Sequence, residues 1–436
     1  MTDTSLFEFP KGMIRTGIVL LCIDTALVLF GLIFPSFLAI ALCYQFNAIF
    51  VPVVLVVISI KGLKKWNRQP WERGTLRLSV AYLMISVLLA GTCIYATFIE
   101  PYNLKLKRIT IRSDKITRPV RLLHVSDIQS SKVGRYEEKV FSLMNELGPE
   151  ILLFTGDLLD SVSAGDPENE LRKMAGLLNT LSPSGGIWGV VGDVDAPITG
   201  LPSDKLGGMK LLQNEKAIVL FPSGNNGKPP QTDSIALFGL SLFDSRSGNK
   251  SRELVSEWLK TVEPGAFTIV IGHGPDYVLH INDLPVDLCL AGHTHGGQIR
   301  IPFFGPILTL SKVPRDWARG FRQVGSTRLN VSAGVGCEHR PFLPPIRFLC
   351  KPEMTLIELL PEAKKAPEGV DRITGLLQMI QTGSFCRIGD LRDLQFGKRY
   401  LVDQNQDTQI FIQLSCKNYL PSLRNTTIDK PVNKEV

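Results

Sequence analysis

The chain has 436 residues, a net charge of +7 and a mean hydropathy of +0.12. This length is enough for more than one domain. The basic residues are spread along the chain and form no stripe interleaved with aromatic residues, so we expect no nucleic-acid partner. None of the eight cysteines belongs to a CxxC pair, which argues against a zinc ribbon and a CxxC redox motif.

Three apolar runs lie near the N-terminus, at residues 16–34, 37–60 and 78–99. Each approaches or exceeds the roughly 20 residues that a helix needs to cross a bilayer. We therefore expect a tail at 1–15 and a membrane region at 16–99 with three transmembrane helices. Two helices and a re-entrant segment at Pro35 are the alternative. Asp24 lies within the first run, and its charge should face a neighbouring helix rather than lipid.

The loop between the second and third runs carries six basic residues: Lys61, Lys64, Lys65, Arg68, Arg73 and Arg77. The positive-inside rule places such a loop in the cytoplasm, and the chain after residue 100 is then outside. Four basic residues that follow the last run oppose this orientation: Lys105, Lys107, Arg108 and Arg112. We expect an integral membrane protein whose partner is the lipid bilayer and whose later domain is extracytoplasmic.

From about residue 103, short apolar runs alternate with amphipathic stretches. Strands are predicted at 121–126, 150–155, 186–191, 235–240, 268–271 and 285–291, and helices at 136–147 and 171–181. This alternation indicates an α/β domain. We expect a linker at 100–117, the α/β domain at 118–361 and a polar, partly disordered C-terminal extension at 362–436.

Polar side chains follow five of the predicted strands. They are Asp127 and Gln129, Asp157 and Asp160, Asp193 and Asp195, His273, and His293 and His295. Side chains beyond the carboxyl ends of strands converge on one crevice in an open α/β sheet. A single aspartate there is commonly a turn former or a helix N-cap, and the two histidines of a Gly-rich turn could be solvated. Five such strand ends together favour a metal site.

A cluster of carboxylates and imidazoles can hold two divalent ions that share one carboxylate. Such a pair generates a bound hydroxide and clamps both oxygens of an in-line phosphoryl displacement. The sequence therefore predicts hydrolysis of a phosphate ester or pyrophosphate bond.

The motifs SDIQ, TGDLLD, GDVD, GHGP and GHTHGGQ, in this order, resemble those of the calcineurin-like metallophosphoesterases. The continuation GHTHGGQIRIPFFGP, then GVG at 334–336 and PPIRFLCKPEMTLIEL, is similar to the membrane-anchored bacterial branch of that family. The resemblance covers about residues 118–361. It implies a four-layer α/β/β/α sandwich, a dinuclear site with manganese, iron or zinc, and a place in the bacterial inner membrane.

The resemblance also implies a ligand set. The first ion would be held by Asp127, Gln129, Asp157 and His295. The second would be held by Asp157 as the bridge, Asp193, His273 and His293. Asp160 would support these ligands without binding an ion itself. No side chain is assigned as the catalytic acid.

Two positions depart from the family pattern. Gln129 stands where the family has a histidine, and an amide oxygen binds transition metals less well than imidazole. Val194 stands where the family has the histidine that assists the leaving group. Loss of general-acid help costs about 10²–10⁴ in rate. Favoured substrates should therefore have good leaving groups, as in phosphodiesters or pyrophosphates.

These observations predict a membrane-anchored, metal-dependent phosphoesterase that acts on a lipid-linked or envelope phosphate. UDP-diacylglucosamine, which related enzymes cleave, is one candidate substrate. Arg300 and Arg340 could bind its phosphate oxygens, but a surface or interface role is favoured for each. The rival hypothesis is a catalytically impaired metal-binding or scaffolding membrane protein that has kept the fold.

Overall fold

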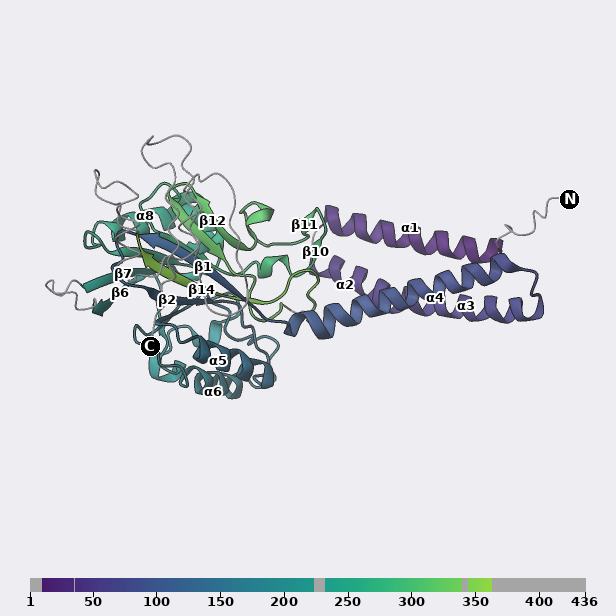
Figure 1. Ribbon diagram of the computed structural model, residues 1–436, viewed down its shortest axis with the longest axis horizontal. Helices are drawn as coiled ribbons and strands as arrows, with labels where there is room; N and C mark the ends of the chain where they lie inside the picture. Colours follow the sequence, from purple (N-terminus) through teal and green to yellow (C-terminus); the bar gives the residue numbers. More distant parts are fainter. Residues whose placement is uncertain (1–9, 35, 223–231, 339–343, 363–436) are drawn as a thin grey trace, which may run out of the picture. The chain divides into compact units, whose positions relative to one another are not determined.

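A computed structural model describes residues 10–34, 36–222, 232–338 and 344–362 (Figure 1). The C-terminal extension predicted at 362–436 lies, apart from its first residue, outside the described residues, and so does Arg340.

The N-terminal region is helical. It contains α1 (Lys11–Ile33), α2 (Phe37–Gln45), a π-helical turn (Phe46–Phe50), α3 (Val51–Arg68) and α4 (Arg73–Ile94). In the described part of the chain, three helices are long and apolar enough to cross a membrane: Lys11–Ile33, Leu38–Arg68 and Arg73–Tyr102. The prediction of three apolar helices is confirmed, whereas Pro35, where the alternative placed a re-entrant segment, lies outside the described residues. The tail predicted at 1–15 is too long, because α1 already begins at Lys11.

Asp24 lies within α1 and faces another helix. Its Oδ1 atom accepts a hydrogen bond of 2.6 Å from Asn47 Nδ2, in the π-helical turn. An amide donor therefore compensates part of the cost of an acid at membrane depth.

Two six-stranded mixed sheets form the centre of the domain that follows. The first has the order β1 (Lys105–Ser113), β14 (Glu353–Pro361), β2 (Val120–Val125), β3 (Ile151–Phe154), β4 (Ile187–Gly189) and β5 (Lys210–Leu211). The second has the order β12 (Gly320–Val324), β13 (Thr327–Val331), β9 (Leu288–Ala291), β8 (Phe267–Ile271), β7 (Thr232–Gly239) and β6 (Glu215–Pro222). The central strands β2–β3–β4 and β7–β8–β9 run parallel.

The two sheets pack face to face with helices outside. Their shared core contains Leu122 and Leu153 from the first sheet and Ile269 and Leu290 from the second. A second cluster joins the first sheet to α5 (Arg135–Leu147) and α6 (Pro167–Leu178). A third joins the second sheet to α8 (Gly248–Leu259) and α9 (Val278–Ile281). The arrangement is the expected four-layer α/β/β/α sandwich, with α5 and α6 on one side and α8 on the other (Figure 1).

The segment predicted as a linker at 100–117 is part of the sandwich. It contains β1, which pairs in parallel with β14 from Lys105 opposite Glu353 to Ser113 opposite Pro361. The prediction was wrong because the alternating side chains of β1 pair with a strand about 250 residues away, and no local pattern reports such a partner.

The sandwich contacts the helical region at the end of α4. The Glu100 carboxylate accepts hydrogen bonds from the backbone N–H groups of Leu349 (3.0 Å) and Cys350 (2.6 Å). Ile346, Ile299 and Phe348 pack with Ala41 of α2 and with Ala96. Ile299 directly precedes a small hairpin of β10 (Arg300–Ile301) and β11 (Gly305–Pro306). The base of this hairpin therefore rests on the apolar helices.

Candidate metal centre

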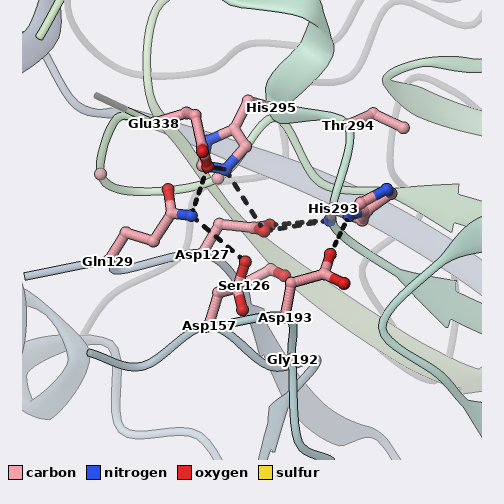
Figure 2. Close-up of polar contacts among 12 residues, drawn as sticks. Ser126, Asp127, Gln129, Asp157, Gly192, Asp193, His293, Thr294, His295 and Glu338 are labelled. Atoms are coloured by element: carbon pink, nitrogen blue, oxygen red, sulfur yellow. Dashed lines mark hydrogen bonds and ion pairs between the residues drawn. The ribbon is translucent and has the colours of Figure 1, made fainter. Parts of the chain in front are cut away.

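The polar side chains singled out from the sequence follow strands of both sheets. Asp127, Asp157 and Asp193 follow β2, β3 and β4, whereas His273 follows β8 and His293 and His295 follow β9. A hydrogen bond links the ends of the two sheets here, because His273 Nδ1 lies 2.8 Å from the carbonyl oxygen of Thr155. The carboxylates and imidazoles thus meet where the two sheets end together (Figure 2).

One group of side chains surrounds Asp193. Its Oδ2 atom lies 2.7 Å from His293 Nδ1 and 3.3 Å from His273 Nε2. Asp157 Oδ2 lies 3.3 Å from the same His273 nitrogen. Asp193, His273 and His293 offer ligand atoms within 4.8 Å of one another, which is close enough to hold one metal ion.

A second group surrounds Asp127. With Asp157 and His273 it offers another set of ligand atoms within 4.8 Å. His295 Nε2 lies 3.6 Å from Asp127 Oδ1, and Gln129 Nε2 lies 3.2 Å from Asp157 Oδ2. The structure therefore brings together all of the residues named as ligands, and Asp157 touches both groups.

The histidine tautomers suit metal binding. The hydrogen bonds from His273 Nδ1 to Thr155 and from His293 Nε2 to the Leu310 carbonyl (3.0 Å) require protons on those nitrogens. The opposite nitrogens face the carboxylates, and they are the atoms that a metal ion would bind once it displaces their protons. His273 Nε2, both ring nitrogens of His295 and Gln129 Oε1 are buried without a hydrogen-bond partner among the described residues. Buried polar atoms are costly when unsatisfied, and divalent ions would satisfy them.

The backbone around the centre is strained. Five of the proposed ligands have φ in the left-handed region: Asp127 (51°), Gln129 (43°), Asp157 (54°), His293 (67°) and His295 (48°). Such conformations cost about 1–3 kcal/mol each and gather at functional sites. Gly292 lies beside them, and a Cβ there would collide with the Ser126 hydroxyl. These tight turns hold several ligands close to one another, at the cost of backbone strain.

The charges of the centre perturb each other. Burial and the neighbouring Asp157 raise the pKa of Asp127 to about 6, although His273 and His293 oppose the rise. Burial opposes protonation of His273, but the carboxylates of Asp157 and Asp193 outweigh it and raise the pKa of the imidazole. Burial would raise the pKa of Asp193 too, yet hydrogen bonds from the two histidines hold it below its ordinary value. The centre is a buried, acid-rich site that favours cations.

Asp195 supports the loops that carry the ligands. Its Oδ1 atom accepts hydrogen bonds from the N–H groups of Leu158 (2.8 Å) and Leu159 (3.3 Å), and its Oδ2 atom accepts one from Gly192 (2.9 Å). Burial and the charge of Asp157 raise the pKa of this carboxyl to about 7. Asp160, to which the sequence assigned a supporting role, is also buried, and its Oδ1 atom accepts a bond from Ser163 N–H (3.1 Å).

Val194 and Arg300 both donate hydrogen bonds to the loops that carry the proposed ligands. The N–H of Val194 donates to Asp157 Oδ1 (3.0 Å), and its side chain is buried. Arg300 Nη1 donates to the carbonyl oxygen of Gly296 (2.8 Å), within the GHTHGGQ turn. Arg300 therefore braces the turn that carries His295, in addition to any contact with substrate.

A cleft of about 530 Å³ adjoins the Asp193 group. It is lined by Arg246, Asp276, Ile307, Leu308, Thr309, Leu310, Ser311, Lys312 and Arg315. Leu310, whose carbonyl oxygen bonds His293, is one of these lining residues. Arg246, at the end of α7 (Leu242–Arg246), donates from Nη1 to Asp193 Oδ1 (2.6 Å). Sequence reasoning missed Arg246, because a single arginine in an exposed helix carries no motif.

Glu338 was also missed. Its Oε2 atom accepts a hydrogen bond of 2.7 Å from Gln129 Nε2 and lies 4.0 Å from His295 Nε2. Figure 2 shows its carboxylate beside His295 and Gln129, on the side of the centre away from Asp193. The only sequence signal was its position two residues after the GVG turn.

A model of the calcineurin-like phosphoesterase family matches residues 120–297, the segment that contains every ligand expected from the sequence. The chain is similar to this family over that segment. It is a hydrolase of phosphate ester or pyrophosphate bonds, and its apolar helices make it a membrane protein.

Curated relatives share most of the chain. The uncharacterised metallophosphoesterase YkuE of Bacillus subtilis is 29% identical over 68% of this chain and 99% of its own length. The phosphodiesterase YaeI of Escherichia coli is 23% identical over 61% of this chain and 92% of its own. The UDP-2,3-diacylglucosamine pyrophosphatase LpxG of Chlamydia muridarum is 24% identical over 62% and 94%, respectively.

Proposed function

We propose that this phosphoesterase hydrolyses a phosphodiester or pyrophosphate bond of a lipid-linked substrate at the surface of the bacterial inner membrane. The observation that carries the proposal is the convergence of four imidazole and carboxylate groups, Asp157, Asp193, His273 and His293, with Asp127 and His295 beside them. The phosphodiesterase and pyrophosphatase relatives support the two reaction types.

Two divalent ions, manganese, iron or zinc, would fit these residues. Asp127, Gln129, Asp157 and His295 would hold the first ion, and Asp157, Asp193, His273 and His293 would hold the second. When bound, such a pair supplies Lewis-acid activation of water and of the phosphate. The protein contributes the strained turns that fix the ligands and the backbone carbonyls that set the imidazole tautomers.

The cleft beside Asp193 would receive the phosphate group. Arg246 presents a guanidinium at its edge, and Lys312 and Arg315 add two more cations to its lining. Guanidinium groups bind phosphate oxygens with paired hydrogen bonds. Val194 provides no proton for the leaving group, so the bond that breaks should release a stable anion. A nucleoside phosphate or a second phosphate satisfies this requirement, whereas an alkoxide does not.

The hairpin β10–β11 supports a substrate that lies in the bilayer. Phe303 at its tip is fully exposed, and Phe304 and Ile301 are also exposed, although the base of the hairpin rests on the apolar helices. Exposed Phe side chains are suited to insert into the boundary between the lipid headgroups and the acyl chains. Phe304 in turn contacts the cleft, because the Arg315 guanidinium lies 4.8 Å from its ring centre. The hairpin thus links the bilayer surface to the cationic cleft.

The catalytic domain lies on the extracytoplasmic side in this proposal. The support is the set of six basic residues that the structure places in the last turns of α3 and the first turns of α4, at the end of the hairpin that the positive-inside rule retains in the cytoplasm. Proteinase K added to intact spheroplasts should then digest the domain. A domain that survives until the cells are lysed would place it in the cytoplasm.

The reaction is tested with detergent-solubilised full-length protein, Mn²⁺ and three probes. We expect turnover of UDP-2,3-diacylglucosamine and of bis-p-nitrophenyl phosphate. Hexyl phosphate should turn over at least about 100-fold more slowly, because its leaving group needs a proton. Equal turnover of hexyl phosphate would contradict the proposed bond type. No turnover of any probe would favour the scaffolding protein, whose support is the pair of departures at Gln129 and Val194.

A further inference from the structure

The first metal position has a carboxylate that no family motif assigns. Glu338 Oε2 lies 2.7 Å from Gln129 Nε2 and 4.0 Å from His295 Nε2, and the Glu338 side chain is only 12% exposed. Gln129 Nε2 also donates to Asp157 Oδ2 (3.2 Å). The amide nitrogen of Gln129 therefore donates to two carboxylates, those of Asp157 and Glu338. The Glu338 carboxylate thus lies beside the proposed ligands of the first ion.

The GHTHGGQ turn itself positions Glu338. Gln298 Oε1 accepts a hydrogen bond from the N–H of Glu338, and Gln298 Nε2 donates to the Glu338 carbonyl oxygen (3.0 Å). This two-point contact joins the last residue of the histidine motif to the backbone of residue 338. The carboxylate is thereby held beside His295, only three residues before Gln298.

A buried arginine fixes the preceding turn. Arg347 is fully buried, and its guanidinium donates to the carbonyl oxygens of Ala333 (2.8 Å), Gly334 (3.3 Å) and Gly336. Gly336 N–H donates to the Asp127 carbonyl oxygen (2.7 Å). The turn that leads to Glu338 is therefore bonded directly to a proposed ligand of the first ion, and little freedom remains at residue 336.

We infer that Glu338 is a ligand of the first ion and replaces the imidazole that is missing at position 129. The inference rests on the proposed metal centre. The first position then has oxygen donors from Asp127, Asp157, Gln129 and Glu338 and a single imidazole, His295. The second position has two imidazoles. Oxygen-rich sites suit Mn²⁺, whereas imidazole-rich sites suit Zn²⁺. The two positions should therefore differ in metal preference, with Mn²⁺ at the first.

The test measures metal content rather than turnover. Full-length protein in detergent is stripped with chelator, titrated with Mn²⁺ alone and followed by electron paramagnetic resonance and elemental analysis. The parent should bind two ions. Glu338→Gln should raise the Kd of one ion at least about 10- to 100-fold and leave the other unchanged. Glu253→Gln, an exposed glutamate on α8, is the matched control and should bind like the parent.

A rescue variant separates ligand loss from misfolding. Gln129→His combined with Glu338→Gln restores the family imidazole, so it should regain two ions and bind Zn²⁺ more tightly at the first position than the parent does. Unchanged Mn²⁺ affinity in Glu338→Gln would overturn the inference and leave the proposed function intact. A double variant that fails to regain the ion would also overturn it. A parent that binds no ions would remove the proposed function as well.

Discussion

The imidazole of His293 donates from Nε2 to the carbonyl oxygen of Leu310, 3.0 Å away. The cleft wall thus sets the tautomer of a proposed ligand, and His293 Nδ1 is directed to Asp193 Oδ2 at 2.7 Å. Asp193 in turn bonds Arg246. The cationic cleft and the second metal position are therefore joined by hydrogen bonds. A substitution in the cleft should change the geometry of the metal ligands, and a substitution of a ligand should change the cleft.

Arg246 should bind substrate phosphate. Arg246→Gln should lower kcat/KM for bis-p-nitrophenyl phosphate about 10- to 100-fold, mostly through KM, because a charge-assisted hydrogen bond contributes about 1.5–3 kcal/mol. Steady-state kinetics of Mn²⁺-loaded protein measure this. Arg252→Gln is the control. Arg252 lies on α8, is exposed and pairs with the exposed Asp283, so its loss should leave the kinetics unchanged. An unchanged KM in Arg246→Gln would rule out phosphate binding by this residue.

Val194 should limit the choice of leaving group. Val194→His should raise the turnover of hexyl phosphate by about 10²–10⁴, because an alkoxide needs a proton as it departs. The gain for bis-p-nitrophenyl phosphate should be much smaller, because p-nitrophenolate is already a stable anion. Val194→Gln is the matched control, with a polar side chain that is not an acid. Equal gains for both substrates in Val194→His would mean that proton donation is not the missing step.

Phe303 should bring the hairpin to the bilayer. Phe303→Asp should reduce turnover of UDP-2,3-diacylglucosamine in vesicles about tenfold, consistent with about 1.5–3 kcal/mol for burial of one large apolar side chain. Turnover of the soluble bis-p-nitrophenyl phosphate should not change. Leu220→Asp, an exposed position on β6, is the control. A parallel loss with both substrates would indicate damage to the centre instead of a membrane contact.

His124 should make the sandwich sensitive to acid. It is fully buried, with Nε2 bonded to Thr155 Oγ1 and Nδ1 facing Asn330 Nδ2. Burial, with a smaller effect of Lys107, lowers its pKa to about 3. The unfolded chain binds this proton near pH 6.5 and the folded chain does not. The stabilising contribution of neutral His124 is therefore complete above pH 6.5 and decreases as pH falls toward 3.

This dependence can be measured by thermal unfolding of metal-free, full-length protein in detergent. Tm should fall between pH 6.5 and 4, and the fall should be smaller in His124→Gln, which cannot titrate. Parallel curves for the two proteins would show that His124 does not carry this pH dependence.

Six strands, β2, β3, β4, β7, β8 and β9, could be predicted from local pattern, and the family resemblance named the proposed ligands at their ends. Each ligand follows an apolar run closely, as Asp157 follows β3 and His293 follows β9, so strand period and motif were sufficient. Packing of the central strands into two parallel sets then brought these residues together.

The residues that sequence reasoning missed depend on distant contacts. Glu338 meets Gln129 across 209 residues, and Arg246 meets Asp193 across 53. β1 became part of the first sheet only through β14. None of these contacts leaves a periodic trace in the sequence, because each depends on how the two sheets close around the site.

The central claim is that the metal centre works as a catalyst. The most direct measurement is hydrolysis of bis-p-nitrophenyl phosphate by Mn²⁺-loaded full-length protein beside Asp157→Asn, which removes the charge shared by both positions. We predict turnover in the parent and its loss in Asp157→Asn. A parent that holds two Mn²⁺ ions yet shows no turnover, while Val194→His does, would contradict the account and favour a scaffolding protein.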